Sequence, residues 1–352
     1  MKVIRSYVYR IYLSHNQIDK FENLFNKNVL LFNIILNNYK NNIKPKLNDI
    51  IENNEELKNG NLNSFLNTYI KTCQKFCKFD CHKIHKKISN FFPKKIHFKM
   101  LQNMTPVINN NHISIPHIGN FRIKYHRPLP VNSHFLHFLI EERTCNEFYI
   151  NFTIEIEVSS NKIQLKKSVG LDYSSPHLFH SSDNELGDKY IVRNFEEDKI
   201  SNLKRRMSKC VLNSKNYLKL RNKQIKLYSK VAEKRKYFLN KASNDLLNNY
   251  DIIGIETLSL SEIAKRKNLG KHTYENAYRK FCKLLEYKAE ILGKKIVKVP
   301  KYFPSSKTCS RCGKINHSLS LNDREFICEC GLKLNRDLNA AINIKNRALI
   351  NL

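Results

Sequence analysis

Apolar and polar positions follow two different periods in the first forty residues. Residues 3–13, VIRSYVYRIYL, place β-branched and aromatic side chains at every second position, which is typical of a half-buried β-strand. From Ser14 to about Tyr39 a broad apolar stripe with helical spacing follows, made of Leu24, Phe25, Val29, Leu30, Phe32, Ile35 and Leu36. Ser14 can cap this segment. The pattern predicts a strand followed by an amphipathic helix.

A second helical pattern covers residues 62–92. It carries three cysteines four positions apart and two following histidines, namely Cys73, Cys77, Cys81, His82 and His85. One straight helix cannot wrap three of its own side chains around one ion, so cysteines on a packing face are the favoured interpretation. A metal site is the alternative.

Residues 104–158 change to strand patterns separated by turns that contain Pro and Gly. The stretches ISIPHIGNFRIKYHRPLP and FLHFLIEERTCNEFYINFTIEIEV both have this character. We expect a small β-barrel or sheet that the N-terminal strand completes. Residues 14–103 would then form a helical lobe inserted into it.

Two short buried strands in the second half of the chain each end in an acid. SVGLD ends at Asp172 and DIIGIE ends at Glu256, and a third strand, KKIVKVPKYF, follows an expected helix over residues 273–292. A last helix is expected over about 335–348. Alternating buried strands and helices predict an α/β core.

The charge balance identifies a class of partner. Lys and Arg number 62 against 31 acidic residues, a formal net charge of +31. Such a protein repels itself unless a polyanion neutralises it, and phosphate contacts release condensed counterions. Nucleic acid is therefore the favoured partner, and a ribosomal or chromatin-like binder without chemistry is the alternative. An anionic membrane surface is less favoured, because no apolar run approaches the roughly 20 residues of a spanning helix. We expect a cytoplasmic, nucleoid-associated protein.

Residues 196–249 form a very basic helical stretch. Tyr217, Tyr228 and Tyr237 are interleaved with the cations, a composition that suits a surface holding a phosphate backbone. The predicted nucleic-acid contacts in this stretch are Arg205, Arg206, Arg221, Lys223 and Arg235. A solvated charged face is the alternative.

Four cysteines near the C-terminus have metal-ligand spacing. They are Cys309 and Cys312 in SSKTCSRCGK and Cys328 and Cys330 in FICECGLK. Four thiolates can enclose Zn²⁺ tetrahedrally. Gly313 and Gly331 each follow a ligand pair, where the turn needs positive φ. The second pair is C-x-C, one residue shorter than usual, so a ribbon without its metal and His317 as a substitute ligand remain alternatives.

Three acids from distant segments are the candidate catalytic residues. Asp172 and Glu256 stand at strand ends, which open into the crevice where α/β sheets bind ligands. Asp337 lies at the start of the last helix, just before Ala340 and Ala341, whose small side chains allow close packing. Converging carboxylates bind hard divalent cations such as Mg²⁺ or Mn²⁺. Two such ions about 4 Å apart can promote phosphodiester hydrolysis.

At these residues the sequence resembles the TnpB (OrfB) family of transposon-encoded, RNA-guided nucleases, which are related to type V CRISPR effectors. The matching segments are GLDYSS, IIGIETL, FPSSKTCSRCG and NRDLNAAINI, together with the N-terminal strand and helix and HIGNFRIKYHRPLP. The resemblance covers nearly the whole chain. It implies a split RuvC-like nuclease of RNase H-like fold whose Asp, Glu and Asp correspond to Asp172, Glu256 and Asp337.

The resemblance also implies a division into four parts. They are a wedge β-barrel at 1–13 and 104–168, a helical recognition lobe at 14–103, the RuvC-like nuclease at 169–304 and 334–352, and the zinc ribbon at 305–333. The family uses a transposon-encoded guide RNA, and base pairing then selects the target DNA. The chain has no Trp after Glu256, where relatives often have one.

The resulting prediction is an RNA-guided DNA endonuclease of a mobile element. Arg336, beside Asp337, is expected to approach the scissile phosphate, with a surface salt bridge as the alternative. Two other functions stay open: a nuclease-inactive, guide-directed DNA-binding repressor and a transposition accessory protein. The sequence leaves the oligomeric state open.

Overall fold

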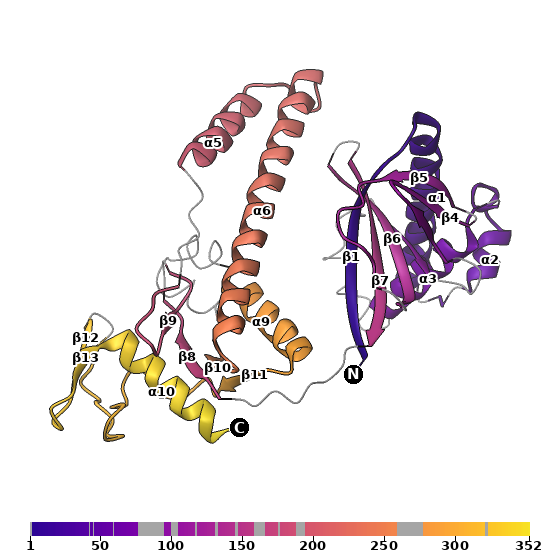
Figure 1. The fold of residues 1–352 in the computed structure, drawn as a ribbon. Helices are drawn as coiled ribbons and strands as arrows, with labels where there is room; N and C mark the ends of the chain where they lie inside the picture. Colours follow the sequence, from indigo (N-terminus) through magenta and orange to yellow (C-terminus); the bar gives the residue numbers. More distant parts are fainter. Residues whose placement is uncertain are drawn as a thin grey trace. The chain divides into compact units, whose positions relative to one another are not determined.

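A computed structural model divides the chain into two compact units, Met1–Val158 and Ser159–Leu352 (Figure 1). The structure describes residues 2–41, 43–44, 46–58, 60–76, 95–99, 105–116, 118–130, 133–144, 147–157, 166–174, 177–187, 194–258, 277–320 and 323–352. None of the helices in these ranges is long and apolar enough to cross a membrane.

The first unit is built on a seven-stranded antiparallel sheet with the order β2-β6-β7-β1-β5-β4-β3. Its strands are β1 (Lys2–Tyr12), β2 (Lys95–Lys99), β3 (Val107–Asn109), β4 (His112–Ile115), β5 (Gly119–Ile123), β6 (His134–Thr144) and β7 (Glu147–Glu157). The period-two pattern of β1 is confirmed, because Val3, Tyr7, Tyr9 and Ile11 are buried while their neighbours are more exposed. β1 therefore lies inside the sheet, between β7 and β5.

The helices described in the first unit lie between β1 and β2 in the sequence, and they pack against one another. They are α1 (His15–Lys40), α2 (Leu47–Glu52), the 3-10 turn η1 (Glu55–Leu57) and α3 (Leu62–Phe76). The Ser14 side chain accepts a hydrogen bond from Gln17 N at 3.4 Å and Ser14 N donates to Gln17 Oε1, a capping box that confirms the predicted helix start. Leu31, Ile35 and Phe65 form the core between the helices.

One segment assigned to the helical lobe belongs to the sheet instead. β2 pairs with β6, Ile96 opposite Ile140 and Phe98 opposite Phe138, so the expectation that the lobe extends to residue 103 is wrong for residues 95–99. Ile96 and Phe98 are buried at alternate positions, which is the reason this stretch forms a strand.

The second unit contains a four-stranded sheet with the order β11-β10-β8-β9. Its strands are β8 (Ser168–Asp172), β9 (His180–Ser181), β10 (Ile252–Glu256) and β11 (Lys295–Val299), and β8, β10 and β11 run parallel. The other elements described in this unit are α5 (Asn194–Ser208), α6 (Lys215–Asn249), α9 (Tyr278–Leu292), the small pair β12 (Glu325–Ile327) and β13 (Lys333–Asn335), and α10 (Arg336–Ile350). The predicted α/β core is present.

Two paired glycines let α10 lie directly on the sheet. Gly170 of β8 is in register with Gly254 of β10. A Cβ atom on Gly170 would come within 2.1 Å of the Ala341 carbonyl oxygen, and one on Gly254 within 2.8 Å of the Ala348 Cβ. No larger residue fits at Gly170 without moving backbone, so these positions fix how closely α10 approaches the strand ends.

The basic stretch 196–249 folds as two helices rather than one. The turn between α5 and α6 contains Asn213 at φ 62°, and Ser214 then caps α6 through its side chain. Figure 1 shows α6 running away from the sheet of the second unit and α5 lying beside its outer part. The Lys234–Glu196 ion pair joins the two helices.

Candidate active site and metal centre

Asp172 and Glu256 are neighbours at the carboxyl ends of two paired strands. β8 and β10 are parallel, and the last register pair, Leu171 opposite Ile255, directly precedes the two acids. The apolar residues before them are buried, while both acids are half-buried. The strands thus present two carboxylates side by side at one sheet edge.

Asp337 reaches the same edge through the packing of α10. The Asn335 side chain caps this helix by accepting hydrogen bonds from Asp337 N at 2.8 Å and Leu338 N at 3.3 Å. Ala341, one turn after Asp337, lies against Gly170, two residues before Asp172. The Asp337 side chain is 26% exposed. The helix start therefore places the third acid near the first.

The electrostatics of Asp172 show that the three acids interact. Burial raises the pKa of the Asp172 carboxyl well above its usual range, and the negative charges of Glu256 and then Asp337 raise it further. Burial also raises the pKa of Glu256, against a hydrogen bond from Ser305 that lowers it. A cluster of this kind is unfavourable when ionised and without a cation, which is the property of a divalent-metal site.

The repulsion among the three carboxylates leads to a prediction about the stability of the folded protein. A raised carboxyl pKa means that the folded state favours the protonated form, so stability is lost as the pH rises through the raised value. Near pH 8, Asp172→Asn should therefore raise the free energy of unfolding of the magnesium-free, zinc-loaded protein by about 1 kcal/mol or more. Each kcal/mol corresponds to a rise of roughly 2–4 °C in melting temperature. The gain should shrink near pH 4.

Thermal unfolding at both pH values checks this expectation. Asp198→Asn, on the exposed start of α5, is the matched control and should leave the melting temperature unchanged. An Asp172→Asn protein that melts lower than wild type near pH 8 would contradict the like-charge cluster.

The three acids do not form a closed ligand set in the structure. Across the described ranges, the one group of three or more possible ligands close enough together to hold an ion is made of the four cysteines. Open spacing suits ions that also bind substrate oxygens and water, whereas a closed set suits a structural ion.

Arg336 faces this acidic cluster. Its Nη2 lies 3.4 Å from Asp337 Oδ1, and its Nη1 donates to the Ser320 carbonyl at 3.4 Å. The guanidinium charge lowers the pKa of Asp172. The Arg336 side chain is 14% exposed, so its ion pair with Asp337 is partly buried.

Three residues of the site were not singled out from the sequence. The Ser305 hydroxyl donates a hydrogen bond to Glu256 Oε1. Asn343 of α10 donates to the carbonyls of Ser305 at 2.8 Å and Thr308 at 2.6 Å, and Asn339 donates to the Thr308 carbonyl at 2.7 Å. Asn339 and Asn343 are buried polar residues on α10. The sequence signal that could have identified the two Asn residues is their spacing of one helical turn beside an Ala-Ala pair.

The four cysteines form a compact sulfur cluster in the second unit. Cys309 Sγ lies 3.6 Å from Cys330 Sγ, and Cys312 Sγ lies 3.6 Å from Cys328 Sγ. All four sulfurs lie within 4.8 Å of one another. A tetrahedron with Zn–S distances of about 2.3 Å has edges of about 3.8 Å, so the sulfurs have room for zinc. His317 is exposed and does not belong to this group.

Backbone turns and amide hydrogen bonds prepare this cluster. Gly313 has φ 77° and Gly331 has φ 84°, which confirms the predicted left-handed turns after the two pairs. Burial alone would raise the pKa of the Cys309 thiol, but the backbone amides of Cys312 and Arg311 outweigh it and lower the pKa to about 6. The C-x-C pair is held between β12 and β13 above the buried Phe326. The site can hold zinc despite its shortened second pair.

The predicted nucleic-acid contacts outside the acidic site are on α5 and α6. Arg205, Arg206, Arg221 and Lys223 are exposed, and Arg235 is half-buried. Between Lys199 and Lys236 the sequence contains fourteen Lys and Arg residues and one acid, Glu233. We call the two helices and their turn, residues 194–249, the basic hairpin.

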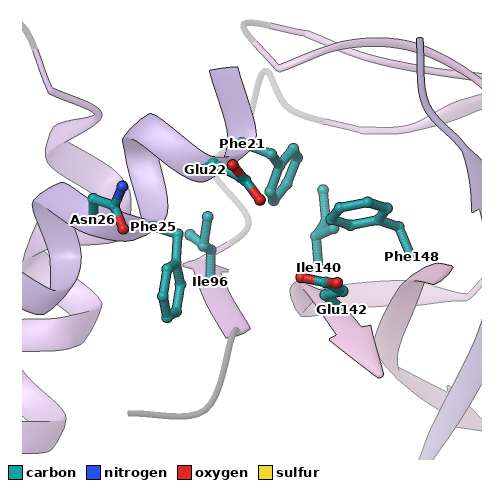
Figure 2. A pocket seen from close by; sticks show the side chains of 8 residues that line it. All are labelled: Phe21, Glu22, Phe25, Asn26, Ile96, Ile140, Glu142 and Phe148. Carbon is teal, nitrogen blue, oxygen red and sulfur yellow. The ribbon is translucent and has the colours of Figure 1, made fainter. Parts of the chain in front are cut away.

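Two other features of the first unit carry no part of this site. Cys73 packs against the helical core, while Cys77, Cys81, His82 and His85 lie outside the described residues. Figure 2 shows a pocket between α1 and the sheet, with Phe21, Phe25 and Phe148 among its apolar walls and Glu22 and Glu142 at its polar side. The candidate acids all belong to the second unit.

Comparison with known proteins gives two family matches in chain order. Residues 151–267, which include Asp172 and Glu256, match the OrfB_IS605 model, described as a probable transposase. Residues 278–344, which include the four cysteines and Asp337, match the Cas12f1-like TNB domain. The two matches are to regions of TnpB (OrfB)-type and Cas12f1-type proteins, and together they include all three candidate acids and the four cysteines.

Individual relatives are named as RNA-guided DNA endonucleases or TnpB-like proteins. A candidate RNA-guided DNA endonuclease of Streptomyces pristinaespiralis is 27% identical over 222 residues, 63% of this chain and 55% of the relative. TnpB-like protein L79 of Acanthamoeba polyphaga mimivirus is 33% identical over 140 residues, 38% of this chain and 26% of the relative. The chain thus spans about half the length, or less, of these curated relatives.

The fold is similar to that of a solved Cas12f1 chain from a complex with sgRNA and target DNA. The TM-score is 0.60 at 13% identity, with 98% of this chain and 99% of the other covered. At this identity the similarity concerns the fold alone.

Proposed function

We propose that this chain is a TnpB-family, RNA-guided, metal-dependent DNA endonuclease of a transposable element. The observation that carries the proposal is the convergence of three acids: parallel pairing of β8 with β10 sets Asp172 beside Glu256, and the packing of α10 on Gly170 brings Asp337 toward them. A family match over all three positions supports it. Mg²⁺ or Mn²⁺ would be held by these three carboxylates, and Zn²⁺ by the four cysteines.

Each residue of the acidic site has a task in this proposal. Divalent ions, when bound, would activate water and stabilise the leaving 3′-oxygen. The carboxylates of Asp172, Glu256 and Asp337 would hold the ions, and the parallel pairing of β8 with β10 sets the first two side by side. Arg336 lies close enough to Asp337 to donate to a phosphate oxygen beside the ions.

The architecture of the proposed enzyme follows the family. The seven-stranded sheet of the first unit would serve as a wedge β-barrel that binds guide RNA, and α1 to α3 as the recognition lobe. The second unit would be a split RuvC-like domain of RNase H-like fold, at 169–304 and 334–352, with a zinc ribbon at 305–333. The names of relatives as RNA-guided DNA endonucleases and the solved sgRNA–DNA complex support a guide RNA and target DNA as partners.

The basic hairpin is proposed as a phosphate-backbone contact. Most of its cations are exposed and they outnumber its acids, so binding there should release counterions. Replacing Arg205, Arg206 and Arg221 together by Ala should weaken binding of a generic 40-nucleotide RNA and lower the slope of log K against log salt by about 0.7 per lost phosphate contact. Fluorescence anisotropy across a salt series measures both quantities.

A charge-matched variant controls for net charge. Lys280, Lys283 and Lys295, exposed on α9 and β11, are replaced by Ala together. We expect a smaller loss of affinity from this variant than from the hairpin variant. Equal slopes for the two would show that the hairpin makes no specific backbone contact.

The direct test of the function is to purify the full chain with the RNA that accompanies it. The RNA is sequenced, a plasmid matching its variable end is supplied with Mg²⁺, and cleavage is followed on a gel. Guide-dependent cutting supports the proposal. Guide-dependent binding without cutting would instead support a repressor, and neither activity would leave an accessory role in transposition.

A further inference from the structure

The segment that enters the cysteine cluster also touches the acidic site. Ser305, which is 6% exposed, donates its hydroxyl hydrogen to Glu256 Oε1. Four residues later the same segment supplies Cys309, the first sulfur of the cluster. Between these two points the chain makes a tight turn, since Thr308 N donates to the Pro304 carbonyl at 3.0 Å.

Two buried amides of α10 fix this segment in place. Asn343 Nδ2 bridges the carbonyls of Ser305 and Thr308, and Asn339 Nδ2 donates to the Thr308 carbonyl. Asn339 Oδ1 also accepts a hydrogen bond from Ser310 N at 3.0 Å. Each buried amide would lose its partners if the segment moved, which costs about 1–3 kcal/mol per unsatisfied group. α10 therefore holds both Asp337 and the segment that carries Ser305.

We propose that Ser305 is a positioning residue that orients Glu256 toward the divalent ions, and that the segment 304–310 ties this orientation to the cysteine cluster. The proposal rests on the metal site of the proposed function. Ser305 donates its hydrogen bond to Oε1 of Glu256, so Oε2 would be the oxygen offered to the ions. Groups that hydrogen-bond a metal-binding carboxylate typically change metal affinity or activity 10–100-fold when removed.

The expected result is a loss of metal affinity without a loss of fold. In zinc-loaded full-length protein, Ser305→Ala should weaken Mn²⁺ binding at the acidic site by about 10-fold or more. Electron paramagnetic resonance of free Mn²⁺ measures this binding, and Asp172→Ala defines the signal that belongs to the site. Ser306→Ala is the matched control, because the neighbouring serine is half-buried and shares no contact with Glu256 among the described hydrogen bonds.

A second readout separates positioning from folding. Guide-dependent cleavage by Ser305→Ala should be slow at low Mg²⁺ and recover toward the wild-type rate as Mg²⁺ is raised, because excess metal compensates for lower affinity. A structural lesion would not respond to metal. Zinc content and the thermal transition of Ser305→Ala should match those of Ser306→Ala, and loss of either would overturn the proposal by making Ser305 a folding residue.

The outcomes distinguish this proposal from the function on which it rests. Equal Mn²⁺ affinities for Ser305→Ala and Ser306→Ala would overturn the role of Ser305 even if wild-type protein cuts DNA. Weaker Mn²⁺ binding in Ser305→Ala would support it even if wild-type protein never cuts, in which case only the endonuclease assignment fails. If Asp172→Ala removed no Mn²⁺ binding relative to wild type, the wild-type protein would bind no Mn²⁺ at the acidic site. That result would overturn both proposals.

Discussion

Replacing Asp172 by Ala is expected to abolish guide-dependent DNA cleavage while guide RNA binding stays within about twofold of wild type. Asp172 ends β8 beside the end of β10, which carries Glu256, and it lies two residues after Gly170, on which the helix that carries Asp337 packs. Without its charge the site loses its shared ligand, and the rate should fall by about 10³-fold or more, at least about 4 kcal/mol of barrier. Plasmid cleavage and copurified RNA measure the two effects in one preparation.

Asp245→Ala is the matched control for this change. Asp245 is exposed on α6, carries the same charge and lies in the same unit. Its removal alters the net charge equally, so cleavage should be unchanged. Asp172→Ala protein that cuts at the wild-type rate would defeat the assignment of the three acids as the nuclease site. Loss of RNA binding together with cutting would point to misfolding instead.

Two of the three acids could be predicted from local pattern alone. A run of three or four apolar or glycine residues followed by an acid predicts a buried strand with a less buried end, and SVGLD and DIIGIE both have this form. Parallel pairing of β8 with β10 then brings Asp172 beside Glu256. The glycines inside these runs carried a further signal, because only positions without a Cβ let α10 approach so closely.

The hydrogen-bonded frame around the site could not be predicted in the same way. Ser305, Asn339 and Asn343 are small polar residues, a type that is mostly exposed. Their burial depends on partners 31 to 49 positions away in the chain, which no local period encodes. A buried polar side chain is stable only when all its hydrogen bonds are made, and that condition is tertiary.

Where the sequence-based prediction misplaced the end of an element, the cause is also physical. Lys95–Lys99 is only five residues long, and its two apolar side chains, Ile96 and Phe98, are too few to stand out from the preceding helical pattern. The break between α5 and α6 depends on Asn213 in a left-handed conformation, which Asn tolerates better than most residues. Both signals are single-residue preferences of about 1 kcal/mol.

Replacing Cys309 by Ala is expected to remove zinc and open the whole cysteine cluster. Cys309 is 1% exposed and belongs to a small hydrophobic core. Among the described residues, the other buried members of this core are Phe326 and Leu332. So small a core cannot hold the fold, and metal binding supplies about 10–16 kcal/mol in comparable modules. Zinc should fall from one ion per chain to almost none, as mass spectrometry of the metal content would show. Amide exchange at Gly313 and Cys328 should lose its protection.

The loss should pass from the cluster to the acids through segment 304–310. When Cys309 is released, segment 304–310 keeps its hydrogen bonds from Asn339 and Asn343 but loses its tie to the cluster, so Glu256 should lose orientation and cleavage should fall with zinc content. Cys210→Ala, in the turn of the basic hairpin and outside the cluster, should keep zinc and cleavage. If Cys309→Ala kept its full zinc content and amide protection, the zinc would have to be bound by something other than the four thiolates. Zinc loss with undiminished Mg²⁺-dependent cutting would instead separate the cluster from the acidic site.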